Sequence, residues 1–130
     1  MFKVTKSIEY AVLLLVSLDV RLNKPLSLTS IAQDKNLPLK YLEKIVLKLK
    51  DNDILASSQG VKGGYFLSRP ASDISLGEII QAVGGKKGLV TCVYGSCDLA
   101  EHCFHKKVWL KLQQILDNEL YKIKLADLLG

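Results

Sequence analysis

Cysteine is scarce in this sequence, which has 3 cysteines among 130 residues. An odd number of cysteines argues against the closed disulfide framework of a small secreted protein and favours a reducing compartment. The apolar run between Glu9 and Asp19 is far shorter than the ~20 residues that a bilayer-spanning helix needs. No small-residue cleavage site of a signal peptide follows this run. We therefore expect a cytoplasmic protein without membrane association, in which the run forms a buried helix.

The chain is too short for two full domains but long enough to bury one hydrophobic core. Its hydrophobic content of 48% and its charged content of 24% are typical of a soluble globular protein. Lysine and arginine number 18, and aspartate and glutamate number 13, which gives a net charge of +5. A basic balance of this kind suggests a polyanionic partner.

Two short helices are predicted after the buried N-terminal helix. Ser27 can cap a helix over residues 28–35, and Pro38 suits the first turn of a second helix over residues 39–50. The second helix has an apolar stripe on one side and lysines on the other. Two such helices joined by a turn of three to four residues are typical of a helix-turn-helix, whose second helix reads DNA.

A β-hairpin is predicted directly after these helices. Residues 54–59 and 64–67 have the pattern of two short strands, and Gly60 and Gly63 lie between them where positive φ is needed. A helix-turn-helix followed by a hairpin is the layout of a winged helix. Between residues 35 and 69 there are seven lysines or arginines against three acidic residues. The sequence therefore predicts that this region binds double-stranded DNA.

Two further helices are predicted in the second half of the chain. Ser75 and Glu78 have the spacing of a capping box, which predicts a helix that ends at Gly84. A long apolar stripe at helical spacing predicts a second helix that starts near Phe104. This stripe either packs back on its own domain or is buried by a second copy of the chain. We expect the homodimer, because two reading heads then match a roughly palindromic operator.

The predicted fold is mainly α, a winged helix-turn-helix with a small β-hairpin wing and a long C-terminal dimerisation helix. Residues 1–83 would form the DNA-binding domain, residues 84–103 a cysteine-rich loop that binds a cluster, and residues 104–130 the dimerisation helix. We expect these three parts to form a single compact unit.

The three cysteines lie close together, at Cys92, Cys97 and Cys103, in a polar segment. Thiolates are soft ligands, and three of them on a short segment suit an iron–sulfur cluster or zinc. Structural zinc sites usually have paired cysteines and four ligands, and no second pair exists here, so a cluster is favoured. Structural zinc or redox-reactive thiols remain the alternative. An enzyme with a cysteine nucleophile and His102 or His105 as base would leave the basic hairpin unexplained, so we expect no enzyme.

The sequence resembles the bacterial winged-helix regulators of the family that contains IscR and NsrR. The matching segments are residues 7–11, 39–44, 60–65, 77–80 and 125–128, together with the three cysteines. The resemblance implies a dimeric regulator, usually a repressor, whose promoter binding is governed by a cluster on the three cysteines. A 4Fe-4S cluster is slightly favoured over 2Fe-2S. The expected DNA-binding residues on the second helix and the hairpin are Lys40, Tyr41, Glu43, Lys44, Gln59 and Lys62.

The resemblance leaves the fourth cluster ligand and the signal open. The spacing of the cysteines is more similar to that of NsrR, and the position of the histidine ligand of IscR is occupied by Lys106. Glu9 of the partner subunit is the favoured fourth ligand, because several relatives carry an acidic residue there, and His105 and His102 are alternatives. A carboxylate is a hard ligand and would bind such a cluster weakly. Nitric oxide, redox state and the supply of iron or clusters are all candidate signals.

Overall fold

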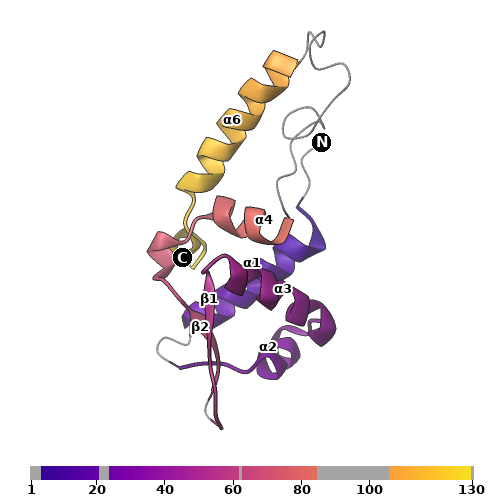
Figure 1. Cartoon of the computed structure of the whole chain (residues 1–130), viewed down its shortest axis with the longest axis vertical. Coiled ribbons are helices and arrows are strands. Elements are labelled where there is room, and N and C mark those ends of the chain that lie inside the picture. The colour runs from indigo at the N-terminus through magenta and orange to yellow at the C-terminus, as the bar shows by residue number, and fades with distance from the viewer. Residues whose placement is uncertain (1–3, 21–23, 62, 85–105, 130) are drawn as a thin grey trace.

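The computed structural model of the chain describes residues 4–20, 24–61, 63–84 and 106–129. Helices make up most of these residues, and one antiparallel hairpin projects from them (Figure 1). The elements in chain order are α1 (Lys6–Val20), α2 (Leu28–Lys35), α3 (Leu39–Asp51), β1 (Leu55–Ser58), β2 (Gly64–Leu67), the 3-10 helix η1 (Ala71–Asp73), α4 (Leu76–Gly84), α6 (Lys106–Lys122) and α7 (Leu125–Leu128). The predicted winged-helix fold class is confirmed.

The hydrophobic core is built around α1, which packs against α2, α3, α4 and β2. Leu14 and Leu15 of α1 are completely buried in it. The predicted inner stripe of α3 is also confirmed, and its members are Leu42, Ile45, Val46 and Leu49. Burying a side chain of this size stabilises a fold by about 1.5–3 kcal/mol. The buried residues of α1 and α3 therefore fix α3 firmly against α1.

The helix-turn-helix begins and turns at the residues that the sequence indicates. The hydroxyl of Ser27 accepts a hydrogen bond of 3.1 Å from the backbone N–H of Ser30, as expected for an N-cap. Asn36 ends α2 in the left-handed conformation, with φ of 53°. α3 begins at Leu39, as predicted. Pro38 is its N-cap, with an extended ψ of 119°, and is not a residue of the first turn as expected.

The hairpin of β1 and β2, which we call the wing, is shorter than predicted at its first strand. Leu55 pairs with Leu67 and Ser58 pairs with Gly64, so the strands leave residues 59–63 for the connection. Leu26 adds an isolated bridge to Tyr65, with hydrogen bonds of 3.0 and 2.8 Å in the two directions. This bridge anchors the base of the wing to the segment that precedes α2.

The C-terminal stretch differs from the single helix expected over residues 104–130. α6 ends at Lys122, and α7 is a separate helix. Between them the chain pairs with the segment before α4: the N–H of Leu76 donates to the carbonyl of Ile123, and the N–H of Leu125 donates to the carbonyl of Ile74, both at 2.8 Å. Leu125 is completely buried. The helix stops here because these backbone groups are taken by tertiary pairing.

Within the residues that the structure describes, no helix is both long and apolar enough to cross a membrane. α6 projects from the rest of the molecule in Figure 1, and only its C-terminal half lies beside α4.

Candidate nucleic-acid interface

The outer face of α3 carries charged side chains at helical spacing. Lys40, Glu43, Lys44 and Leu47 lie at positions i, i+3, i+4 and i+7, and all four are exposed. The buried stripe on the opposite side fixes this orientation. In the described part of the chain, no hydrogen bond or ion pair engages Lys40, Glu43 or Lys44, so these groups are free to meet phosphates and base edges.

Tyr41 lies at the edge of this face and contacts α1. Its hydroxyl shares a hydrogen bond of 2.7 Å with the hydroxyl of Ser7. Its ring also meets the ring of Tyr10 edge-on, with centroids 5.2 Å apart and an angle of 88° between the planes. The side chain is still 37% exposed. The sequence predicts Tyr41 as a DNA-binding residue but does not predict these contacts, because nothing local to either helix indicates which residues of the other helix it meets.

The two lysines near the end of α3 brace the helix against its neighbours. The ammonium of Lys48 donates to the carbonyl of Val83 in α4 at 3.5 Å, and that of Lys50 donates to the hydroxyl of Ser57 in β1 at 3.1 Å. Both residues remain exposed. The basic charge of α3 is therefore divided between a free N-terminal part and a C-terminal part that contacts protein.

The tip of the wing is exposed and turns on a glycine. Gly60 has φ of +107°, as predicted, and the N–H of Gly63 donates to its carbonyl at 3.0 Å. The second glycine with positive φ is Gly64, at +154°, and not Gly63 as expected. Gly63 is required for a different reason, because a Cβ there would overlap the carbonyl of Ser58. The wing projects beyond the helices in Figure 1.

Of the two DNA-binding residues predicted for the wing, the structure describes one. Gln59 lies just after β1 and is exposed. Lys62 lies outside the described residues.

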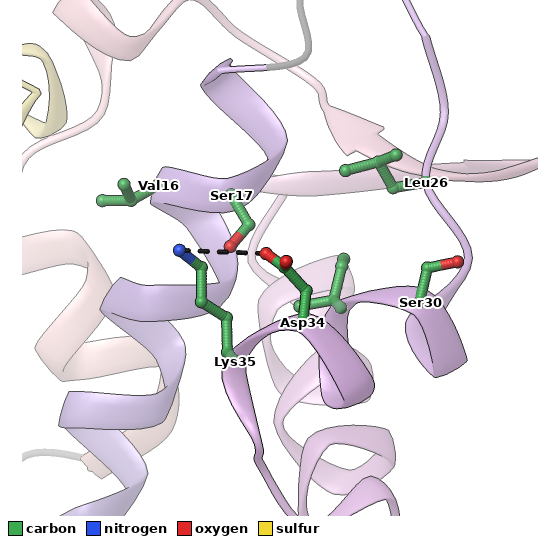
Figure 2. Close-up of a pocket in the computed structure, with 7 residues that line it drawn as sticks. Val16, Ser17, Leu26, Ser30, Asp34 and Lys35 are labelled. Carbon is green, nitrogen blue, oxygen red and sulfur yellow. Dashed lines mark ion pairs between the residues drawn. The ribbon is translucent and has the colours of Figure 1, made fainter.

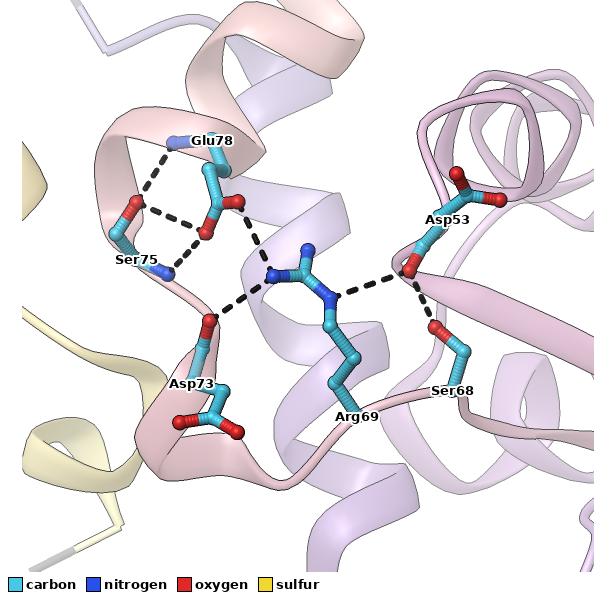
Figure 3. Close-up of polar contacts among 6 residues, drawn as sticks. All are labelled: Asp53, Ser68, Arg69, Asp73, Ser75 and Glu78. Carbon is cyan, nitrogen blue, oxygen red and sulfur yellow. Dashed lines mark hydrogen bonds and ion pairs between the residues drawn. The ribbon is translucent and has the colours of Figure 1, made fainter.

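Arg69 ties the end of α3, the wing and α4 together (Figure 3). Its guanidinium donates to the carbonyl of Asp53 at 3.3 Å, to the carbonyl of Asp73 at 3.0 Å and to the carboxylate of Glu78 at 3.2 Å. Asp53 follows α3 and has φ of 58°, and its carbonyl also accepts a hydrogen bond from the hydroxyl of Ser68. One side chain, carried by the segment that leaves the wing, therefore bonds the turn after α3, the end of η1 and the first turn of α4.

The predicted capping box of α4 is present. The N–H of Ser75 donates to the carboxylate of Glu78 at 2.8 Å, and the N–H of Glu78 donates to the hydroxyl of Ser75 at 3.1 Å. Burial by itself would raise the pKa of Glu78, but the hydrogen bonds from Ser75 and the charge of Arg69 outweigh burial and hold the pKa below its ordinary value. The carboxylate is therefore kept charged at the centre of this network.

Cys92, Cys97, Cys103, His102 and His105 all lie outside the described residues. Across the described ranges, no group of three or more His, Cys, Asp or Glu side chains is arranged to hold a metal ion.

Glu9 is the one candidate ligand that the structure places. It lies in the first turn of α1, exposed, with its carboxylate 3.4 Å from the ammonium of Lys6. An exposed ion pair of this kind contributes little stability, so the carboxylate can exchange Lys6 for another cation. The three thiolates of the sequence and this accessible carboxylate are a donor set that fits an iron–sulfur cluster.

A pocket of about 510 Å³ lies between α1 and α2 (Figure 2). Its lining residues are Val16, Ser17, Leu26, Ser30, Ile31, Asp34 and Lys35. The two charged residues are exposed and lie 4.0 Å apart as an ion pair. The pocket therefore presents charges that already neutralise each other, and no buried polar side chain points to a ligand.

The family model described as "Iron-dependent Transcriptional regulator", Rrf2, matches residues 4–130 of the chain. The chain belongs to the Rrf2 family. It is 33% identical over 132 residues to the transcriptional regulator IscR of Klebsiella pneumoniae (strain 342), which covers 98% of this chain and 80% of that protein. Its relatives of this kind are transcriptional regulators and not enzymes.

Two solved structures of Rrf2 regulators resemble this member closely. IscR of T. potens superposes with a TM-score of 0.76 at 31% identity and covers 98% of this chain and 86% of that one. CymR of B. subtilis, described as the global cysteine regulator, superposes with a TM-score of 0.79 at 28% identity and covers 99% of this chain and 97% of that one. This Rrf2 chain is therefore a DNA-binding transcriptional regulator.

Proposed function

We propose that this Rrf2 regulator is a homodimeric repressor whose operator binding is controlled by an iron–sulfur cluster. The ligands would be Cys92, Cys97 and Cys103 of one subunit and Glu9 of the partner subunit. The observation that carries the proposal is the position of the three thiolates in the sequence. In the sequence they lie between α4, which Arg69 ties to the turn after α3, and α6, which has an exposed apolar face in the described part of the chain.

The DNA contacts are assigned to two elements. Tyr41 and Glu43 of α3 would meet base edges, where a carboxylate accepts a hydrogen bond from the amino group of cytosine. Lys40 and Lys44 flank them on the exposed face and would meet base edges or phosphates. Gln59 and Lys62 would extend the contact from the wing.

The dimer contact is assigned to α6. Val108, Leu112 and Ile115 form one face of the helix and are 55%, 43% and 51% exposed. Apolar residues repeated along one helix face lose contact with water when a second copy of the helix packs on them. Pairing through this face would place two recognition helices on one DNA duplex.

The cluster site would report on the environment through its iron, which when bound supplies a centre reactive toward oxidants and nitric oxide. We favour a 4Fe-4S over a 2Fe-2S cluster. The carboxylate of Glu9 would be a hard ligand that binds a thiolate-rich cluster weakly. The side chains of Glu9 and of Lys6, with which it pairs, are both exposed to solvent. Nitric oxide, redox state and iron or cluster supply are the candidate signals.

The likeness to CymR supports a second candidate function. That protein is described as a global cysteine regulator, and its structure superposes on 99% of this chain with a TM-score of 0.79. In this alternative the three cysteines would act as redox-reactive thiols or hold structural zinc, without a cluster.

Metal analysis separates the two candidates. Protein purified without oxygen is expected to be brown and to contain iron and acid-labile sulfide. Replacement of Cys92, Cys97 or Cys103 by Ala is expected to bleach it. The helical circular dichroism should be kept, because Leu15, Ile45, Leu49 and Ile79 already pack together in one hydrophobic core. Stoichiometric zinc without labile sulfide would establish the alternative.

The fourth ligand is tested by comparing Glu9→Ala with His105→Ala. We expect only the first to change the visible spectrum and the rate of reaction with nitric oxide. Glu119→Ala is a control, because Glu119 is also an exposed helical glutamate that pairs with a lysine, Lys122, at 3.2 Å. A spectrum that changes only with His105→Ala would contradict the assignment of Glu9.

A further inference from the structure

The first two turns of α1 hold the side chain of Tyr41 from two sides. Ser7 bonds its hydroxyl at 2.7 Å, and Tyr10 packs edge-on against its ring at 5.2 Å. Ser7 and Tyr10 lie three residues apart, so they project from the same face of α1. Both are half-buried. Neither belongs to the helix-turn-helix or to the wing.

We propose that Ser7 and Tyr10 are positioning residues for DNA recognition, which set the direction in which Tyr41 meets the bases. The inference rests on the proposed contact of Tyr41 with DNA. It makes α1, which also supplies core residues and Glu9, a determinant of which DNA sequence the protein prefers.

The chemistry of the contact supports a role in positioning. An edge-to-face contact and a hydrogen bond are both directional, so together they select one rotamer of a side chain that would otherwise sample several. A tyrosine hydroxyl can donate one hydrogen bond and also accept. Its bond to Ser7 therefore leaves capacity for a bond to a base, and the residue as a whole is 37% exposed.

The neighbouring side chains on α3 are held differently. In the part of the chain that the structure describes, Lys40, Glu43 and Lys44 have no hydrogen bond or ion pair to α1. Their directions on DNA are set by the DNA itself. Tyr41 is pre-oriented, and pre-orientation lowers the cost of forming one particular contact and therefore increases discrimination between sequences.

The test compares preference with general affinity. A preferred duplex is first selected by the unaltered chain from a random-sequence library, and its affinity is compared with that of a scrambled duplex. Ser7→Ala and Tyr10→Leu are expected to reduce this ratio roughly three- to tenfold, the value of one hydrogen bond. The affinity for the scrambled duplex and its dependence on salt should stay unchanged, because the phosphate contacts remain.

Matched variants separate positioning from a general effect on α1. Ser17→Ala is the control, since the hydroxyl of Ser17 donates to the carbonyl of Leu13 at 2.8 Å within the same helix. It should keep the full preference, as should Ser7→Thr and Tyr10→Phe, which retain the hydroxyl and the ring. Ser7→Ala should have no further effect when Tyr41 is already Phe.

The outcomes distinguish this inference from the proposed function. If Ser7→Ala and Tyr10→Leu are folded by circular dichroism and keep the original ratio, the positioning role is wrong while DNA binding stands. If both lower the affinity for scrambled DNA as much as for the preferred duplex, the contact only stabilises the fold, and the inference is also overturned. If the unaltered chain selects no duplex at all, the proposed DNA contact itself fails.

Discussion

The helices α3 and α6 differ in whether their stripes of apolar residues are buried. In α3 the stripe from Leu42 to Leu49 is buried against α1, so this part of the chain completes its own core. In α6 the corresponding stripe, from Val108 to Ile115, stays exposed, and the most buried residue of the helix outside that stripe is the polar Gln113. A helical spacing of apolar residues therefore has two different outcomes. A stripe that packs against its own chain becomes part of the hydrophobic core, and a stripe that stays exposed is available to pack against a second chain.

The largest difference is expected from Leu49→Ala. Leu49 is completely buried, and truncation of such a leucine costs about 3–5 kcal/mol of the free energy of unfolding. Urea denaturation followed by circular dichroism would measure this loss. Leu47→Ala is the control on the same helix, since Leu47 is exposed and should change the stability by less than about 0.5 kcal/mol. Equal effects of the two changes would mean that α3 does not pack as described.

A charge on the exposed stripe should act on assembly instead. Ile115→Glu places a carboxylate on the proposed dimer face, where its burial would be costly, so the chain should become monomeric and bind DNA more weakly. Gln114→Glu adds the same charge at the next, also exposed, position and should leave the assembly unchanged. Analytical ultracentrifugation decides the point. A dimer that persists in Ile115→Glu at micromolar concentration would place the interface elsewhere.

The attachment of α6 to α4 depends on one glycine. A Cβ on Gly77 would lie 2.5 Å from the ring of Tyr121, whereas among the described residues a Cβ on Gly84 would meet Ile8 at an ordinary 3.9 Å. We expect Gly77→Ala to destabilise the protein by about 1–3 kcal/mol, the usual cost of overpacking. Gly84→Ala, in the same helix, should be neutral or slightly stabilising. Thermal unfolding of the two variants provides the comparison, and equal melting temperatures would contradict this packing.

The smallest effect is expected from pH. Because the pKa of Glu78 is lower in the folded protein than its ordinary value of 4.5, folding favours the charged carboxylate. Its stabilising contribution is therefore present above that ordinary value and is lost as the pH falls through the lowered value. Ser75→Ala removes one half of the capping box and should cost about 1 kcal/mol near neutral pH.

Replacing the carboxylate tests the cause of this pH dependence. Glu78→Gln should make stability below pH 4.5 depend less steeply on pH, as measured by urea denaturation at several pH values. An unchanged slope would assign the acid sensitivity to other carboxylates.

Local pattern was sufficient for most of the fold. The spacing of apolar residues predicted α1, α3 and α6. The polar residues at the starts of α2 and α4 predicted the caps of those two helices. Both kinds of feature involve groups within four residues of one another. The wing followed from glycines between two short apolar stretches. The residues of α3 that we predict to bind DNA were placed on its exposed face for the same reason, since burying one side of a helix determines the other.

Only tertiary structure decided the contacts between distant segments. Tyr41 meets Ser7 across 34 positions of sequence. The backbone of Ile123 leaves the helix to pair with Leu76, and Gly64 is required because Leu26 passes close to it. Each of these depends on two segments that have no periodic relation to each other. The sequence by itself therefore determined which helix faces are buried and which are charged. The packing of α1 against α3 decided how Tyr41 is held on the exposed face of α3.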